Sequence, residues 1–156
     1  MIDQIKKNMP ITITNPHMTR FLMSLDDAMN LVLYAFKNGQ NGQLFVKKTT
    51  SSTMIDLAKA IMLIFKKPKH PIKIIGTRHG EKQHETLLAA EEKLKAIENK
   101  SYFVINPDIR DLNYKNFYTE GVKKIIEKSY TSDNCELLKV NEIVHKLLKL
   151  DFINKE

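Results

Sequence analysis

Short apolar runs alternate with longer segments of helical period along this 156-residue chain, and that alternation is what most limits its fold. Runs of about four residues rich in Ile, Val, Leu and Phe are typical of strands, whereas apolar residues at every third or fourth position predict helices. Elements that alternate in this way indicate a small α/β or α+β domain. We expect strands at 11–14, 20–23, 43–46, 72–75 and 102–105, and helices at 1–8, 24–38, 53–67, 89–99, 119–128 and 140–150.

Particular residues mark the limits of two of these helices. Ser24 is followed three positions later by Asp27, which is the spacing of a capping box at a helix start. Gly39 is expected to end that helix, because glycine readily adopts the backbone conformation found after a last helical turn. The polar run 49–53 is interpreted as a connection into the next helix, which Pro68 is expected to stop. Six methionines are expected to fill the core: Met9, Met18, Met23, Met29, Met54 and Met62.

The net charge of +7 favours binding to a polyanionic partner. Lysines supply 22 of the 25 cationic side chains, and they are scattered among acidic residues, a pattern more typical of a solvated surface than of a binding groove. A small basic nucleic-acid-binding module is therefore the alternative class, but no glycine-rich or aromatic RNA-binding signature accompanies the charge. We expect no nucleic acid partner.

Cysteine content and hydropathy indicate the compartment. Cys135 is the single cysteine, so an internal disulfide framework and a cysteine-rich zinc site are both excluded. The first eight residues contain no apolar run of the kind that a signal peptide needs. The longest apolar stretches, 31–36 and 61–65, fall far short of the ~20 residues that span a membrane. We expect a cytoplasmic protein without membrane insertion.

Motifs that would hold a cofactor or a metal are incomplete. Gly39 and Gly42 have the spacing of part of a dinucleotide-binding turn, but Phe45 stands where a further glycine is needed, and the segment leaves a helix instead of entering one. His84 and Glu85 begin like a zinc-protease helix, yet position 88 is not histidine. The sequence predicts no cofactor site and no metal site, and His79 and His84 are expected on the loop surface.

Two short segments concentrate the residues that suit an anionic ligand. In the first, 18–28, Arg20 precedes an apolar run that leads into the helix at 24–38. In the second, 76–85, Arg78, Glu81 and Glu85 lie on a loop that contains two glycines and follows a strand. A guanidinium offers a planar fork of donors that matches phosphate oxygens, and an ionised carboxylate accepts hydrogen bonds from vicinal hydroxyls.

Together these segments resemble the C-terminal lobe of the extended short-chain dehydrogenases/reductases of capsular and O-antigen polysaccharide biosynthesis. Members of that group are UDP-N-acetylglucosamine 4,6-dehydratases and UDP-sugar epimerases. The pattern Thr-Arg-x-Gly-Glu-Lys-x-x-Glu-Thr-Leu is typical of the group, and residues 77–87 reproduce it. Residues 107–114, 130–134 and 147–153 also resemble the group, so the likeness runs from near residue 10 to the end of the chain.

The resemblance implies a single nucleotide-sugar-binding C-terminal lobe over residues 1–156, with 107–156 as a family-specific C-terminal extension. It implies a fold of short strands and helices without the Rossmann sheet that binds NAD(P) in the complete enzymes. Those enzymes also use a Tyr followed four residues later by a Lys, and none of the five tyrosines here has that partner. The chain is therefore expected to lack catalytic residues and to be inactive alone.

Carried over by position, the resemblance implies that Arg20 and Arg78 contact the UDP diphosphate and that Glu81 accepts hydrogen bonds from the ribose. Glu85 has a counterpart in the family, with either a loop-organising or a substrate-proximal role. Arg110 lies in a recurrent motif and contacts either ligand or a neighbouring acid. From the residues alone, Arg20 paired with an aspartate at the following helix start, or Arg78 paired with Glu81, would be the structural alternatives.

The expected partners follow from the same resemblance. A UDP-sugar is the implied ligand, although the particular sugar and the choice between epimerisation and dehydration stay open. A separate chain that carries the Rossmann half is one possible partner. An apolar face that such a half would cover is expected to be exposed, which predicts self-association.

Overall fold

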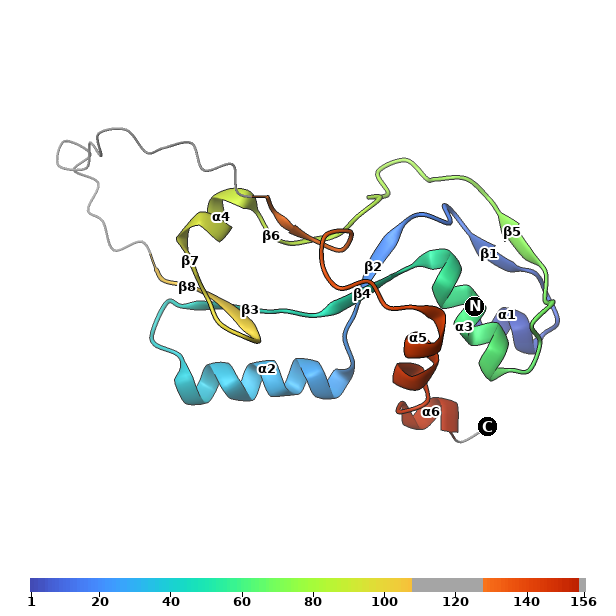
Figure 1. Ribbon diagram of the computed structural model, residues 1–156, viewed down its shortest axis with the longest axis horizontal. Coiled ribbons are helices and arrows are strands. Elements are labelled where there is room, and N and C mark those ends of the chain that lie inside the picture. Colours follow the sequence, from blue (N-terminus) through green and yellow to red (C-terminus); the bar gives the residue numbers. More distant parts are fainter. Residues whose placement is uncertain (108–127, 155–156) are drawn as a thin grey trace. The chain divides into compact units, whose positions relative to one another are not determined.

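The computed structural model describes residues 1–107 and 128–154 of the chain. The chain divides into two compact units that alternate along the sequence, a first unit of residues 1–24, 49–85 and 131–156 and a second unit of residues 25–48 and 86–130. Short strands and helices make up both units (Figure 1), and the described strands form sheets of only two or three strands. The expected α/β class is confirmed. Arg110 and nearly all of the helix expected at 119–128 lie outside the described residues.

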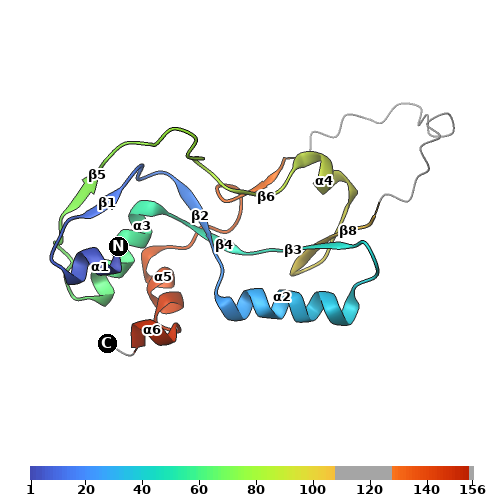
Figure 2. The same cartoon turned by 180° about the vertical axis from the view of Figure 1, so that it is seen from behind.

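The described part of the first unit contains two small sheets. In one, β1 and β5 run parallel with Ile11 opposite Ile72. In the other, β2 and β4 run antiparallel with Arg20 opposite Ser52. The elements of this unit, visible from both sides in Figure 1 and Figure 2, are α1 (Ile2–Lys6), β1 (Ile11–Ile13), β2 (Thr19–Leu22), β4 (Thr50–Thr53), α3 (Met54–Ile64), β5 (Ile72–Ile74), α5 (Val140–Leu147) and α6 (Asp151–Asn154).

Helices α1 and α3 share one apolar core with strand β1. Ile5 and Ile11 are fully buried there, together with Ala58, Ile61 and Met62 of α3. The spacing of three and four residues within α3 puts its apolar side chains on one face of the helix. Burial of one large aliphatic side chain contributes about 1.5–3 kcal/mol, so this cluster holds together segments that are distant in sequence.

The polar run expected to be a connection is instead strand β4. Ser51 and Ser52 are completely buried in it, and the Ser51 hydroxyl donates to the carbonyl of Ser132. Small hydroxyl-bearing side chains fit a buried strand where larger polar ones would not. At the end of β4, Thr53 Oγ1 accepts a hydrogen bond from the backbone N–H of Asp56 at 3.1 Å and donates to its carboxylate at 2.8 Å. Thr53 is thus the N-cap of α3.

Helix α3 ends earlier than the Pro68 signal predicts. Its last residue is Ile64, and Lys66 adopts a left-handed backbone with a φ of 53°. The N–H of Lys67 then donates to the carbonyl of Met62 at 2.9 Å, which closes the helix in a Schellman-type turn. The backbone reversal at Lys66, rather than the proline, stops the helix.

The region expected as one helix at 140–150 forms two. Helix α5 ends at Leu147 and α6 follows it, with Ile143 fully buried. Among residues 1–107 and 128–154, no helix has both the length and the apolar character needed to cross a membrane.

The second unit is built on a three-stranded antiparallel sheet in the order β3-β8-β7. Helix α2 runs alongside β3 in both views (Figures 1 and 2), and its Tyr34 ring stacks on Tyr102 with centroids 4.1 Å apart. Val46, Leu88 and Phe103 form a separate buried cluster. The elements are α2 (Leu25–Asn38), β3 (Leu44–Lys47), β6 (Thr86–Leu88), α4 (Ala90–Lys95), β7 (Ala96–Glu98) and β8 (Tyr102–Ile105), with β9 (Tyr130–Thr131) pairing with β6 where the chain returns to the first unit.

Two expectations about helix ends in this unit have opposite outcomes. Gly39 ends α2 as predicted: its N–H donates to the Ala35 carbonyl at 2.8 Å, and a Cβ at this position would lie 2.4 Å from that oxygen. The prediction of a helix over residues 89–99 is wrong beyond Lys95, where α4 ends. The backbone of the next three residues pairs with β8 in strand β7, so tertiary pairing overrides helix propensity there.

The methionines are distributed differently from the prediction. Met18 and Met62 are buried, as expected for core residues. Met9, Met23 and Met29 are exposed, so the assignment of these three to the core is wrong. Met29 lies on the outer face of α2, and helical periodicity alone does not tell a core face from an apolar face that nothing covers.

Replacement of the Thr53 cap should measurably weaken the first unit. We expect Thr53→Ala to lower the free energy of unfolding by about 1 kcal/mol, because the N–H of Asp56 loses its acceptor. Urea denaturation monitored by circular dichroism measures this change. Thr53→Ser keeps the hydroxyl and should stay close to wild type. Equal stability of the Ala and Ser variants would contradict the capping role.

Candidate functional site

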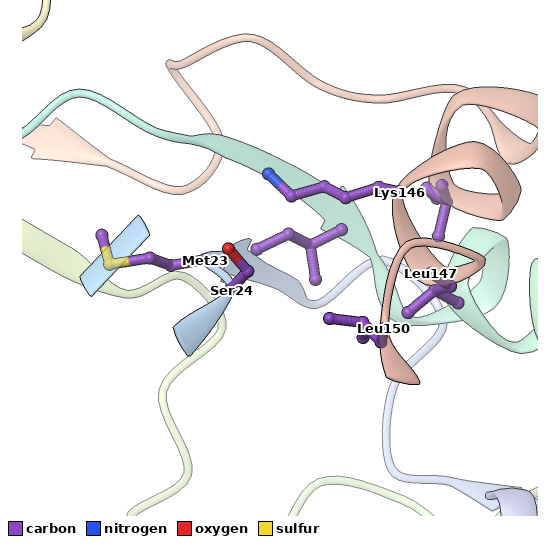
Figure 3. A pocket seen from close by; sticks show the side chains of 7 residues that line it. Met23, Ser24, Lys146, Leu147 and Leu150 are labelled. Atoms are coloured by element: carbon purple, nitrogen blue, oxygen red, sulfur yellow. The ribbon is translucent and has the colours of Figure 1, made fainter. Parts of the chain in front are cut away.

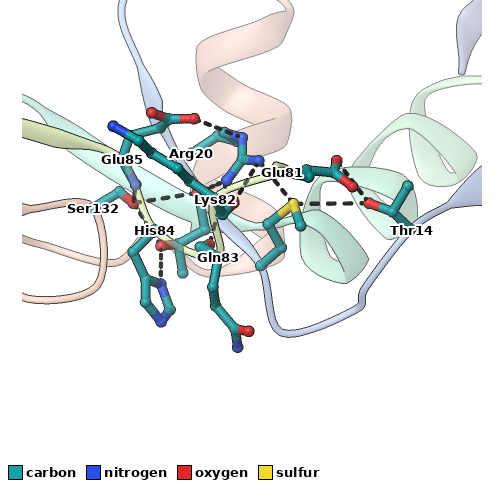
Figure 4. A network of polar contacts seen from close by, with 10 residues as sticks. Thr14, Arg20, Glu81, Lys82, Gln83, His84, Glu85 and Ser132 are labelled. Carbon is teal, nitrogen blue, oxygen red and sulfur yellow. Dashed lines mark hydrogen bonds and ion pairs between the residues drawn. The ribbon is translucent and has the colours of Figure 1, made fainter. Parts of the chain in front are cut away.

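The candidate site lies in the first unit, where strand β2 meets the loop 75–85 that follows β5. Arg20 projects from β2, and Arg78, Glu81 and Glu85 lie on the loop (Figure 4 shows Arg20, Glu81 and Glu85). Gly76 and Gly80 have φ values of 84° and 78°, which residues with a Cβ rarely adopt. The two glycines allow the turns that bring the loop back toward β2.

Backbone carbonyls of the loop are the main partners of the Arg20 guanidinium. Nη2 donates to the carbonyl of Lys82 at 2.9 Å, and Nη1 donates to those of Gln83 at 3.3 Å and Thr19 at 2.7 Å. Two of these oxygens, those of Lys82 and Gln83, belong to the loop, and the third belongs to Thr19 of β2 itself. Arg20 therefore fastens the loop to strand β2 (Figure 4).

The remaining donors of Arg20 are also engaged. Its Nε lies 3.4 Å from Glu85 Oε1, and Nη2 has a second contact with the sulfur of Met18 at 2.8 Å. Both terminal nitrogens of the guanidinium are thus hydrogen-bonded within the protein, and Nε is in an ion pair. The acid that pairs with Arg20 is thus Glu85. Asp27, at the following helix start, forms a 2.6 Å ion pair with Lys47.

Glu81 closes the tip of the loop. Its carboxylate accepts hydrogen bonds from the backbone N–H of Arg78 at 3.2 Å and from Thr14 Oγ1 at 3.0 Å, and its own N–H donates to the Arg78 carbonyl at 3.1 Å. The bond from the Arg78 N–H is the largest cause that lowers the pKa of Glu81, and the Thr14 hydroxyl and the charges of Arg20 and Arg78 lower it further against partial desolvation. Glu81 is a fixed anion that only accepts hydrogen bonds.

Arg78 is the exposed cation of this group. Its backbone, rather than its guanidinium, makes the contact with Glu81 that the structure shows. Among residues 1–107 and 128–154, no carboxylate lies within ion-pair distance of the Arg78 guanidinium. The hydrogen bond from the Arg78 N–H is the main cause of the lowered pKa of Glu81, and the charges of Arg20 and Arg78 are lesser causes.

A hydroxyl network beneath the loop was not foreseen from the sequence. Thr19 Oγ1 lies 2.6 Å from Ser132 Oγ and 2.7 Å from His84 Nδ1, and both hydroxyl-bearing residues are buried. Ser132 Oγ also accepts from the N–H of Glu85 at 2.9 Å, and the Ser132 N–H donates to the Glu85 carbonyl at 2.8 Å (Figure 4). His79 is exposed as expected, but His84 is half-buried and hydrogen-bonded, so its assignment to the surface is wrong.

A separate hollow of about 70 Å³ lies between β2 and α5 (Figure 3). Leu22, Leu147 and Leu150 line it together with the stem of Lys146, whose Nζ donates to Thr50 Oγ1 at 3.1 Å. Its walls are apolar and contain none of the four predicted site residues. A charged nucleotide would find few hydrogen-bond partners there.

The chemistry of the loop site is that of an anion and polyol receptor. Two guanidinium groups supply positive charge, and one fixed carboxylate supplies acceptors. Among the described residues, no cluster of three or more His, Cys, Asp or Glu side chains is arranged to hold a metal ion. Such a donor set can bind and orient a ligand that carries both phosphate and hydroxyl groups.

Two protein-family models together match the chain over nearly its whole length. Residues 1–107 match the model described as "Polysaccharide biosynthesis protein". Residues 108–154 match the model described as "Polysaccharide biosynthesis protein C-terminal".

Curated relatives are about half identical to this chain over the part that aligns with it. A protein of Rickettsia bellii named "UDP-glucose 4-epimerase" is 49% identical over 156 residues, which is 99% of this chain and 46% of the relative. A protein of Rickettsia rickettsii with the same name is 48% identical over the same shares. The chain therefore spans slightly less than half the length of these relatives.

A solved structure has the same fold. "Pen from Bacillus thuringiensis" superposes with a TM-score of 0.76 at 29% sequence identity, and the match covers 95% of this chain and 42% of that one. The similarity in structure therefore extends over both units, and it again involves less than half of the longer protein.

The hydrogen bond from Thr14 should be detectable in the titration of Glu81. The pKa of Glu81 is lower in the folded protein than its ordinary value of 4.5. The ionised carboxylate therefore stabilises the folded loop fully at pH values above 4.5. This stabilisation is lost as the pH falls through the lower pKa of the folded state. Thr14→Val should raise the pKa of Glu81 toward 4.5 without reaching it, because the Arg78 N–H remains. Carboxyl-carbon NMR titration measures the change.

Thr12→Val is the matched control for that titration. Thr12 lies in β1, two residues before Thr14, but its hydroxyl accepts from Gln4 Nε2 at 2.9 Å. The Glu81 titration should be the same as in wild type. An unchanged Glu81 pKa in Thr14→Val would show that the loop tip is not held by this bond.

Proposed function

The chain belongs to the polysaccharide biosynthesis protein family, and on that basis we propose that it is the UDP-sugar-binding lobe of a nucleotide-sugar epimerase or 4,6-dehydratase. The relatives named UDP-glucose 4-epimerase support a role related to nucleotide-sugar epimerisation. The observation that carries the proposal is the attachment of the loop that bears Arg78 and Glu81 to strand β2, through the guanidinium of Arg20. A nucleoside diphosphate offers phosphate oxygens to guanidinium donors and ribose hydroxyls to a carboxylate acceptor.

Arg78 is the first phosphate ligand in this proposal. Its guanidinium is exposed and no carboxylate among the described residues neutralises it, so a phosphate could bind without breaking an internal ion pair. Arg20 provides the second positive charge, and a phosphate oxygen would replace the 3.4 Å contact with Glu85, the longest of its contacts. Charge-assisted bonds from guanidinium to phosphate are stronger than bonds to neutral carbonyls.

The two acids have different roles. Glu81 has two hydrogen bonds on its carboxylate, and about four lone-pair sites are available on such a group, so it retains capacity for ribose hydroxyls. Glu85 acts as a positioning residue, because its side chain contacts Arg20 and its backbone is bonded to Ser132 on both sides. Loop organisation is the role that these contacts favour for Glu85.

The described residues do not fit an NAD(P) site. Gly39 terminates α2, and Gly42, with a φ of 80°, lies in the turn that follows. A phosphate-binding glycine turn must instead come between a strand and the start of a helix. In this proposal, hydride transfer is carried out by the rest of a longer protein or by a separate chain. The role proposed for this lobe is to hold the nucleotide while the sugar reacts elsewhere.

The expected affinity of this lobe is low. Hydrogen bonds to charged groups contribute roughly 1.5–3 kcal/mol each, so two arginine contacts and one ribose contact yield about 4–7 kcal/mol before ordering costs. That range corresponds to dissociation constants from about millimolar to about ten micromolar. A weak but saturable interaction with UDP is the expected behaviour.

Loss of Arg78 should weaken UDP binding. We expect Arg78→Ala to raise the Kd for UDP about tenfold or more, because a charge-assisted bond to phosphate is lost. NMR titration of the labelled protein measures this Kd. Lys82→Ala, which removes an exposed cation from the same loop, should change it much less. Equal Kd values for Arg78→Ala and wild type would contradict the proposed anchor, and salt-dependent RNA binding without any response to UDP would favour the nucleic-acid class.

The isolated chain should bind without turnover. With NAD and UDP-glucose supplied, we expect no UDP-galactose above the level of a protein-free control, because the chain lacks the Tyr/Lys pair and the glycine turn. Chromatography of the nucleotide-sugars measures the product. Sustained epimerisation by the purified 156-residue chain would show that its own residues complete an active site.

A further inference from the structure

Helix α2 of the second unit carries an apolar stripe that nothing in the described chain covers. Its residues recur at spacings of four, three, one and three, which puts them along one face of the helix. Phe36 is 86% exposed and Leu25 is 77% exposed, values far above those of core residues. The stripe consists of Leu25, Met29, Val32, Leu33 and Phe36, all exposed.

The opposite face of α2 is already used. Tyr34 packs on Tyr102 and meets Phe45 edge to face at 5.8 Å, and Asp27 pairs with Lys47 of strand β3. These contacts fix which side of the helix lies against its own sheet. The stripe therefore points away from that sheet and does not belong to the core between α2 and the sheet.

Single exposed apolar residues are ordinary, but a continuous stripe of five along one helix is not. Further large apolar side chains of the same unit are also exposed, including Leu44 of β3 and Ile97 of β7. Water-exposed area of this extent is unfavourable, and surfaces of this kind in soluble proteins mark contacts with other protein.

The length of the relatives identifies the occupant. This chain spans 46% of the Rickettsia relatives, so more than half of each relative consists of residues with no counterpart here. In those proteins both halves belong to one polypeptide and must share a surface. We propose that the α2 stripe is the surface that docks that other half of the fold, whether it lies on the same polypeptide or on a separate chain.

A second copy of this chain fits the stripe less well. Helix α2 has 14 residues, which is about 21 Å at 1.5 Å per residue. Two helices of this length paired along their stripes make a small contact, whereas stable interfaces bury roughly 1,200–2,000 Å². A whole domain offers a larger surface than a second copy of the helix.

Coexpression tests the docking surface directly. The complete 156-residue chain is produced together with the part of the Rickettsia bellii relative that it does not match, each with its own affinity tag. We expect the two polypeptides to copurify, and we expect Phe36→Glu to reduce recovery of the partner at least tenfold. Asn30→Glu, an exposed change on the polar side of the same helix, should leave recovery unchanged. Circular dichroism melting should show both variants folded, because neither side chain is buried.

Three outcomes would overturn the inference. The partner could be recovered equally well with wild type and with Phe36→Glu. The chain could instead form a homodimer that Phe36→Glu dissociates, with no capture of the partner. The third outcome is that the two polypeptides do not associate at all. Light scattering during size-exclusion chromatography separates these results.

The inference depends on the proposed function in one respect, namely that this chain works as one lobe of a longer fold. The docking surface and the nucleotide-anchor function can be refuted by separate experiments. UDP titration of Phe36→Glu should match wild type, because the arginines lie in the first unit and Phe36 in the second. Docking without UDP binding would refute only the nucleotide-anchor function, and UDP binding without docking would refute only the surface assigned here.

Discussion

The geometry of the candidate site depends on the capture of loop 75–85 by the guanidinium of Arg20. Strand β2 holds Arg20 in place through its pairing with β4, and the side chain then donates to the carbonyls of Lys82 and Gln83. The Gln83 carbonyl also accepts from the Thr19 N–H at 3.0 Å, so the backbone of β2 and the side chain of Arg20 together hold the loop. The positions of Arg78 and Glu81, on the glycine-containing part of the same loop, follow from this attachment.

Ser132 fixes the other side of the same structure. Its hydroxyl and backbone join Thr19 of β2 to Glu85 of the loop, and the Ser51 hydroxyl of β4 bonds its carbonyl. One small buried residue thus connects three segments that are distant in sequence. Such networks are stable only when every polar member has a partner, and Ser52, whose buried Oγ has no hydrogen-bond partner, is the exception beside it.

What the sequence predicts correctly is mostly local. The strands at 11–14 and 102–105 and the end of α2 at Gly39 follow from side-chain alternation and from glycine chemistry, which act over a few residues. Strands β4 and β7 were missed because their pairing partners lie elsewhere in the chain. The motif around Arg78 indicated the loop, but the Ser132 network has no local signal, since Thr19 and Ser132 are 113 positions apart. Ligand contacts of the four site residues stay proposals.

The alternation of the two units along the sequence has a consequence for biosynthesis. Residues 1–24 are synthesised before the segment that supplies Ser132 and helix α5 to the same unit. The first unit therefore completes its interior only after that later segment has been synthesised, and its earlier strands stay partly exposed until then. Late closure through distant contacts slows folding and extends the time during which chaperones have access to the nascent protein.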